Sequence, residues 1–193
     1  MDAVQQPDSG YPGTPMVLAP LVFTFWNRVL AFDPQVPIWP NRDRFVLSNG
    51  HATMLLWSIL HLPKTQAVNA AYERLGRPAV TLDDIRRFRQ LDSKAPGHPE
   101  YHWISRVETT TGPLGQGVAT SVGMAIAGEW LAAWSNRPEC PHVNGPSPLE
   151  QGTHAQGGRH AAAARPRALR TAAPEAVETT LPMLWAVVHG AVT

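Results

Sequence analysis

A glycine-rich stretch followed by a long apolar run most constrains what this chain can fold into. The stretch is Thr109-Thr110-Thr111-Gly112-Pro113-Leu114-Gly115-Gln116-Gly117, and the apolar run continues over 118–134. Glycine permits positive φ angles and lets a ligand approach the backbone without meeting a Cβ atom. A helix that begins at such a turn directs N–H groups and the positive end of its dipole forward, which favours an anion such as a phosphate. The stretch therefore predicts either a phosphate-binding turn or an ordinary glycine-rich helix entry.

Two common glycine-loop motifs do not fit this stretch. Gly112 and Gly117 have the spacing of a P-loop, but Val118-Ala119 stand where that motif requires Lys-Ser/Thr. The dinucleotide-binding fingerprint is nearly matched from Gly115 onward, but Thr120 replaces its third glycine or alanine. The stretch therefore belongs to neither motif.

Composition and charge narrow the class of protein. A chain of 193 residues has room for one domain or for part of a larger one. The net charge of +1 gives no reason to expect nucleic acid or an anionic membrane as a partner. The single cysteine, Cys140, forbids an internal disulfide and fits a reducing compartment. No apolar run reaches the roughly 18 residues that span a bilayer. We expect a soluble cytoplasmic protein that binds neither nucleic acid nor membrane.

Hydrophobic periodicity predicts the elements of the first half of the chain. Residues 9–15 are expected to form a turn-rich loop, and a helix is expected to begin at Pro20 and continue to Leu30. A short buried strand is expected over 44–47, followed by a polar turn and a helix over 52–62 that Ser48 or Asn49 can cap. Strand, tight turn and helix form half of a βαβ unit, which favours a binding site at the turn.

Two further helices are expected before the glycine-rich stretch. The first covers 66–75, and the second runs to Leu91 from a near capping box formed by Thr81 and Asp84. Leu82, Ile85, Phe88 and Leu91 are expected to face inward. Arg86, Arg87 and Arg89 are expected to form a solvated face with no function.

Two histidines are candidate site residues. His51 falls in the first turn of the 52–62 helix, where an imidazole N–H can reach an anion, although it also fits an ordinary polar helix entry. His98 is held between Gly97 and Pro99, and this stiff backbone suits a positioned donor or general acid–base. The same loop also fits an ordinary surface turn.

The chain changes character after Pro138. Residues 141–193 contain no Asp, Ile, Phe, Tyr or Lys, and Ala, Pro, Gly and Arg dominate them. Such a composition buries too little apolar surface to offset the entropy of ordering. We therefore divide the chain into a partial domain over 1–138 and a low-complexity tail over 139–193 that is expected to be disordered.

Four segments of the chain together carry a family resemblance: Ser9–Met16, Asp43–His51, Phe88–Glu100 and Glu108–Gly117. Their content, order and spacing resemble the N-terminal, diphosphate-binding region of a transketolase, and the resemblance covers residues 1–138. It implies an α/β fold, with a partial parallel sheet flanked by helices in an incomplete thiamine diphosphate-binding domain.

The resemblance also implies an activity and a site. Transketolases use thiamine diphosphate and a divalent metal, usually Mg²⁺, to move a two-carbon ketol unit from a ketose phosphate to an aldose phosphate. They act as homodimers on sugar phosphates of the pentose phosphate pathway. By resemblance, Gly112, Pro113 and Leu114 line the cofactor, His51 contacts it near the diphosphate, and His98 faces the hydroxyl end of the substrate.

The chain also departs from the family pattern. Tyr11 stands where the family has a histidine, and a phenol with its ordinary pKa near 10 does not shuttle protons at neutral pH as an imidazole does. The family's Gly-Asp-Gly motif and later Asn, which hold the metal, have no counterpart here, so no metal ligand is predicted. The pyrimidine-binding domain, whose Glu activates the cofactor, has no counterpart either. These departures predict a truncated chain that is inactive by itself.

Two alternatives remain open beside an inactive transketolase fragment. The chain can be a non-catalytic module that binds a transketolase subunit or the cofactor. A separate chain can also supply the missing domains, although the metal motif would still be absent.

Overall fold

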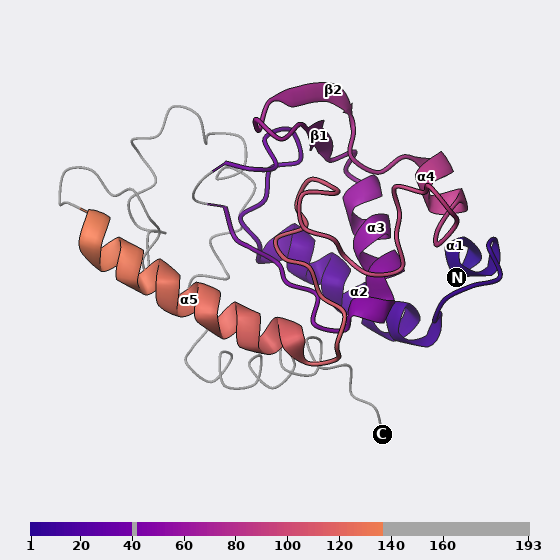
Figure 1. The fold of residues 1–193 in the computed structure, drawn as a ribbon, viewed down its shortest axis with the longest axis horizontal. Coiled ribbons are helices and arrows are strands. Elements are labelled where there is room, and N and C mark those ends of the chain that lie inside the picture. The colour runs from indigo at the N-terminus through magenta and orange to yellow at the C-terminus, as the bar shows by residue number, and fades with distance from the viewer. Residues whose placement is uncertain (40–41, 137–193) are drawn as a thin grey trace.

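The computed structural model describes residues 1–39 and 42–136 (Figure 1). Both Cys140 and the predicted disordered tail over 139–193 lie outside the described residues. Two helices, α2 (Gly13–Arg28) and α3 (Thr53–His61), pack together at the centre of the described part of the chain. The short α1 (Asp2–Gln5) and α4 (Leu82–Arg86) lie to one side, and α5 (Gln116–Ser135) runs away on the other.

Helix α3 is the centre of the core. A 3₁₀ turn, η1 (Gly50–Ala52), leads into it, in agreement with the helix predicted over 52–62. All but two of its nine residues are buried, and Trp57 and Leu60 are completely enclosed. Helix α2 packs on α3 through a stripe at i, i+4 spacing formed by Leu18, Val22 and Trp26. Val22 and Trp26 lie within the predicted helix over 20–30, but Leu18 precedes its predicted start. Helix α2 begins at Gly13, and Pro20 lies inside it rather than at its first turn.

The parallel sheet predicted from the resemblance does not occur among the described residues. Residues 42–47, the predicted strand among them, are not part of any sheet. Their polar groups find other partners: the Leu47 carbonyl accepts from the Thr111 hydroxyl at 2.8 Å, and the Asp43 carbonyl accepts from Arg106 at 2.9 Å. A parallel pair needs a second extended segment after a crossover helix. The residues that follow α3 form an antiparallel hairpin instead.

That hairpin replaces the helix predicted over 66–75. Strands β1 (Gln66–Val68) and β2 (Arg74–Pro78) pair antiparallel, with Gln66 opposite Pro78 and Val68 opposite Arg74. The Asn69 side chain closes the turn, since its Oδ1 accepts from the backbone N–H groups of Ala71 and Glu73. An Asx-type turn of this kind competes directly with helix formation. The helical spacing of the apolar residues was therefore a misleading signal.

Helix α4 confirms the predicted cap but is shorter than expected. The Thr81 hydroxyl accepts from the Asp84 N–H at 3.1 Å, and the Asp84 carboxylate accepts from the Thr81 N–H at 2.8 Å. The helix ends at Arg86, so only Ile85 and Phe88 of the expected inward face are buried. Leu82 and Leu91 are exposed.

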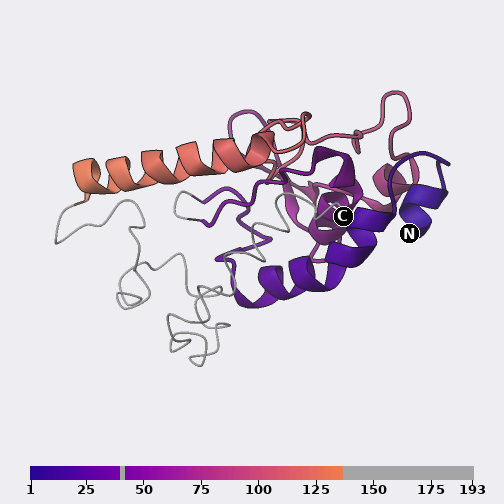
Figure 2. The same ribbon diagram turned by 90° about the horizontal axis from the view of Figure 1, so that it is seen from below.

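Helix α5 confirms the helix predicted behind the glycine-rich stretch. It follows Gly115, which has a φ of +86°, a value that favours glycine. Beyond its first turn, α5 extends away from α2 and α3 in both views (Figure 1 and Figure 2). Gly117 is its one buried residue, so most of its apolar side chains are exposed. No helix in residues 1–39 and 42–136 is long and apolar enough to cross a membrane.

Candidate functional site

Three loops that are far apart in the sequence meet at Gly50. A Cβ atom at this position would lie 3.0 Å from the Thr111 carbonyl oxygen and 3.1 Å from Cδ2 of His98. The absence of a side chain at Gly50 is therefore what lets the His98 loop and the Thr111 turn close on the start of α3. The Thr111 N–H donates to the Pro99 carbonyl at 3.2 Å and links these two loops to each other.

The start of α5 is fastened to the same place. A Cβ atom at Gly117 would lie 2.5 Å from Cα of Ser48, closer than two carbon atoms can approach. The Val118 N–H, in the first turn of α5, donates to the Ser48 hydroxyl at 3.2 Å. Ser48 therefore caps α5, while the predicted capping of the 52–62 helix by Ser48 or Asn49 is not found in η1 or α3. The helix entry is thus built by tertiary contacts.

The turn ahead of α5 presents its backbone to open space. No atom lies within 4 Å of the position that a Gly112 Cβ would take, and Pro113 and Leu114 are exposed. Some donors here are already used, since the Gly112 N–H donates to the Gln116 side chain and the Gln116 N–H donates to the Pro113 carbonyl. A ligand therefore has room at this turn, but it meets fewer free N–H groups than a bare helix end would offer.

His51 occupies the floor of the site. It is half-buried, and its ring packs edge-on against the Tyr11 ring with centroids 4.9 Å apart. Burial, and to a lesser degree the nearby His98, lower the pKa of His51 below its ordinary value of 6.5. The imidazole is therefore neutral at pH 7, with one nitrogen that donates and one that accepts.

His98 lies on a loop whose backbone is hydrogen-bonded to side chains of α3. The Thr53 hydroxyl donates to the Gly97 carbonyl at 2.8 Å, and the Trp57 indole donates to the Pro96 carbonyl at 3.0 Å. Pro99 is buried, whereas His98 itself is exposed. The loop is therefore more than a free surface turn, since its backbone is fixed and its imidazole faces the His51 side of the site.

The structure thus brings together most of the residues that the sequence singled out. Tyr11 contacts His51, and the edge of His98 reaches Gly50, next to His51. Gly112 follows directly after Thr111, whose carbonyl lies against Gly50. Tyr11 is 56% exposed and forms the outer side of this group.

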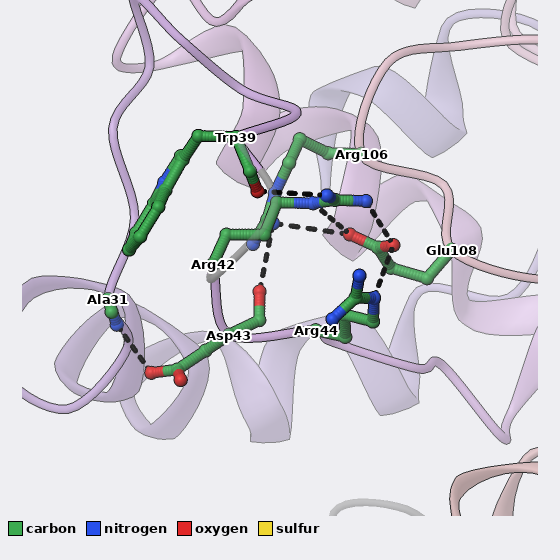
Figure 3. A network of polar contacts seen from close by, with 7 residues as sticks. All are labelled: Ala31, Trp39, Arg42, Asp43, Arg44, Arg106 and Glu108. Carbon is green, nitrogen blue, oxygen red and sulfur yellow. Dashed lines mark hydrogen bonds and ion pairs between the residues drawn. The ribbon is translucent and has the colours of Figure 1, made fainter. Parts of the chain in front are cut away.

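The structure contains a buried ionic network at the residues that lead into the glycine-rich stretch (Figure 3). The sequence did not predict it. Arg42 donates to both carboxylate oxygens of Glu108, at 3.0 and 2.8 Å. Arg106 and Arg44 also reach this carboxylate, at 3.2 and 3.8 Å. Glu108 is only 4% exposed, so these contacts fix the segment that leads into Thr109–Gly117. The signal was available, since Arg42 directly precedes one of the four resemblance segments and Glu108 is the first residue of another.

Arg106 is an unfavourable member of this network. Its side chain is 1% exposed, yet its Nε and Nη2 atoms have no hydrogen-bond partner. Burial lowers the pKa of Arg106 to about 10, although the charge of Glu108 acts in the opposite direction. Its backbone φ is +74°, in the region that favours glycine. A cavity of about 360 Å³ borders this network, with Arg106, Tyr101 and His102 among its lining residues.

Metal-ligating side chains are not gathered within the described ranges. Residues 1–39 and 42–136 contain no group of three or more His, Cys, Asp or Glu side chains placed to hold a metal ion.

Comparison with known proteins first defines the class of this domain. A family model described as "Transketolase, thiamine diphosphate binding domain" matches residues 1–146. The described residues thus have the fold of a thiamine diphosphate-binding domain, in its transketolase N-terminal form. With most of its length matched by this model, the chain belongs to the transketolase family.

Individual relatives match a similar share of this chain. Transketolase 1 of Vibrio cholerae is 51% identical over 138 residues, which are 72% of this chain and 19% of that protein. A transketolase structure from Leishmania mexicana has a TM-score of 0.64 and 45% identity, and the match covers 74% of this chain and 19% of that one. A Pichia stipitis transketolase in complex with sedoheptulose 7-phosphate has a TM-score of 0.61 and 45% identity over 72% of this chain. The chain spans about a fifth of the length of these relatives.

Proposed function

We propose that residues 1–136 form the diphosphate side of a transketolase site. Its function is thiamine diphosphate-dependent transfer of a two-carbon ketol unit from a ketose phosphate to an aldose phosphate. The observation that carries this proposal is the convergence of Tyr11, His51, His98 and the Gly112–Leu114 turn around Gly50. Family membership and a relative that binds sedoheptulose 7-phosphate support the choice of substrate class.

The residues present fit the cofactor. Bound thiamine diphosphate supplies the carbanion chemistry of ketol transfer. The Gly112–Leu114 turn offers open backbone for it, with no Cβ at Gly112 in the way. Burial lowers the pKa of His51, so its imidazole is neutral at pH 7 and can donate one hydrogen bond to a phosphate oxygen. These residues bind and orient the diphosphate.

Tyr11 and His98 face the substrate side in this proposal. His98 is exposed on a fixed loop, so its imidazole can bind a substrate hydroxyl and move a proton at a ring nitrogen. Tyr11 is exposed and packs on His51, and its hydroxyl can donate a hydrogen bond. Through this hydroxyl Tyr11 serves as a binding group at the position where the family has a histidine.

Binding of the cofactor is the first test. We expect thiamine diphosphate to bind the 193-residue chain weakly, since a helix end supplies only roughly 0.3–1 kcal/mol per charge contact. Replacement of His51 by Ala should weaken binding further, whereas His102→Ala, a change at an exposed histidine outside the site, should not. Equal affinity in calorimetric titrations of wild type and His51→Ala would contradict the proposal.

Activity is the second test. We propose that residues 1–193 by themselves carry out no ketol transfer, since they include no Gly-Asp-Gly metal motif and a bound metal is usually the largest charge in such a site. The assay combines the purified chain with xylulose 5-phosphate, ribose 5-phosphate, thiamine diphosphate and Mg²⁺. Formation of sedoheptulose 7-phosphate would refute this part of the proposal.

A second candidate function is a non-catalytic module that binds a transketolase subunit. The exposed apolar surface of α5 favours it, since Ile126, Trp130 and Trp134 are all more than half exposed. Co-purification of this chain with a full-length transketolase would support this function. It would also indicate that the chain pairs with that subunit as in a homodimer. A chain that stays monomeric in the mixture would argue against it.

A further inference from the structure

Arg89 differs from the two arginines beside it. Arg86 forms an ion pair with Asp83 at 3.1 Å, and Arg87 donates to the Leu91 carbonyl at 3.3 Å. Arg89 has a φ of +59°, and its N–H donates to the Ala95 carbonyl at 3.1 Å, so the chain turns here toward the His98 loop. No carboxylate in residues 1–39 and 42–136 pairs with its guanidinium group.

The Arg89 side chain lies between two glycine turns of the candidate site. A Cβ at Gly97 would lie 3.4 Å from Cγ and Nε of Arg89, and one at Gly10 would lie 3.9 Å from its Cδ. The guanidinium carbon is 6.0 Å from the centre of the Tyr11 ring. Arg89 is exposed, in agreement with the predicted solvated face, but its side chain also lies against the loops that carry Tyr11 and His98.

We propose that Arg89 is a further substrate-binding residue of this site and that it takes the phosphate group of a sugar phosphate. This inference rests on the proposed function. The Tyr11 ring packs on the His51 imidazole and lies 6.0 Å from the Arg89 guanidinium carbon, so Arg89 and the imidazole assigned to the cofactor border the same tyrosine. A second anion that enters beside Tyr11 thus meets a cation with no carboxylate partner. The planar guanidinium offers paired donors suited to phosphate oxygens.

The test compares Arg89→Met with Arg86→Met, a matched loss of charge at the end of α4 that leaves the site intact. Ribose 5-phosphate and ribose are titrated into each protein, and the ring protons of Tyr11 and His98 are followed by NMR. We expect Arg89→Met to weaken ribose 5-phosphate binding about three- to tenfold, as for the loss of one charged contact. Arg86→Met should bind as wild type does, and ribose should not respond to either change.

Thiamine diphosphate titrations in the same proteins separate this inference from the proposed function. We expect Arg89→Met to leave cofactor affinity unchanged. A wild-type chain that binds ribose 5-phosphate but not thiamine diphosphate would contradict the proposed function and leave Arg89 as an oxyanion site. Unchanged ribose 5-phosphate affinity in Arg89→Met, no binding by wild type, or a loss confined to thiamine diphosphate would overturn the inference. If Arg89→Met does not fold, Arg89→Lys serves instead, with a smaller loss of affinity expected because lysine keeps the charge and loses only the planar fork.

Discussion

Arg106 shows at the scale of one residue how a buried charge can oppose the fold that contains it. Its network partner Glu108 is already paired bidentately with Arg42. Arg106 adds a further cation to Arg42 and Arg44, two N–H-bearing atoms without partners and a left-handed backbone. Each of these features costs free energy in the folded state.

Replacement of Arg106 by Gly should therefore stabilise the chain. We expect the free energy of unfolding to rise by about 1–2 kcal/mol, because relief of strain, of desolvation and of unsatisfied groups exceeds the loss of the contacts through Nη1 and of the guanidinium's contact with the Phe32 ring. Since burial lowers the pKa of Arg106 from its ordinary value to about 10, its charge disfavours folding throughout the pH range below 10. The increase in the free energy of unfolding should thus be constant between pH 6 and 9. A lower urea midpoint for Arg106→Gly at pH 7 would show that the network depends on Arg106.

His51 provides a second test at this scale. Its pKa is lowered first by burial and then by His98, so His98→Gln should raise the pKa of His51 without restoring 6.5. Because the folded pKa lies below the unfolded one, stability should fall as the pH drops below about 6.5. An NMR titration of the His51 ring protons measures the pKa directly. A His51 pKa of 6.5 or above in the wild-type chain would refute the burial that the structure shows.

At the scale of elements, α5 depends on Ser48. Replacement of Gly117 by Ala puts a methyl group 2.5 Å from Cα of Ser48, a backbone atom that cannot rotate away. We expect a loss of roughly 2–4 kcal/mol, at or above the usual cost of overpacking. Gly123, in the same helix, has open space around it, and Gly123→Ala should stabilise α5 by about 0.5–1 kcal/mol. Urea melts of both variants would measure these changes, and equal midpoints would show that α5 is not docked on Ser48.

The elements that the sequence predicted are those with strong local signals. The capping box at Thr81 and Asp84 needed only neighbouring residues to specify it, and the helical pattern behind Gly115 is also local, although the first turn of α5 is held by Ser48. The β1–β2 hairpin was missed because one side chain, Asn69, closes a turn inside an apolar pattern with helical spacing. Ser48 was assigned to the wrong helix, because its partner Val118 is 70 residues away.

The candidate site was predicted more fully than the fold around it. Motif spacing identified His51, His98 and the Gly112–Leu114 turn, and the structure places them around Gly50. The contact between Tyr11 and His51 and the position of Arg89 could not be predicted, since both depend on how separate loops pack. The role of each residue in cofactor or substrate binding remains a prediction.

At the scale of the whole molecule, the exposed face of α5 should govern association. Trp130 and Trp134 stack with ring centroids 5.7 Å apart and are 60% and 78% exposed. Apolar surface of this kind promotes association. We expect sedimentation velocity to show concentration-dependent association of the chain. The double variant Trp130→Glu and Trp134→Glu should stay monomeric to higher concentration, and identical behaviour of the two proteins would exclude this face as the cause.

The most direct test of the central claim is an NMR map of thiamine diphosphate binding to the 193-residue chain. The claim is that Gly50 joins His51 and the Gly112–Leu114 turn into one cofactor-binding site. It predicts that the largest shifts occur at the His51 ring and the Gly112 amide, while His102 remains unchanged and His51→Ala reduces all shifts together. Shifts centred on the cavity beside Arg106, or no shifts at saturating cofactor, would contradict it.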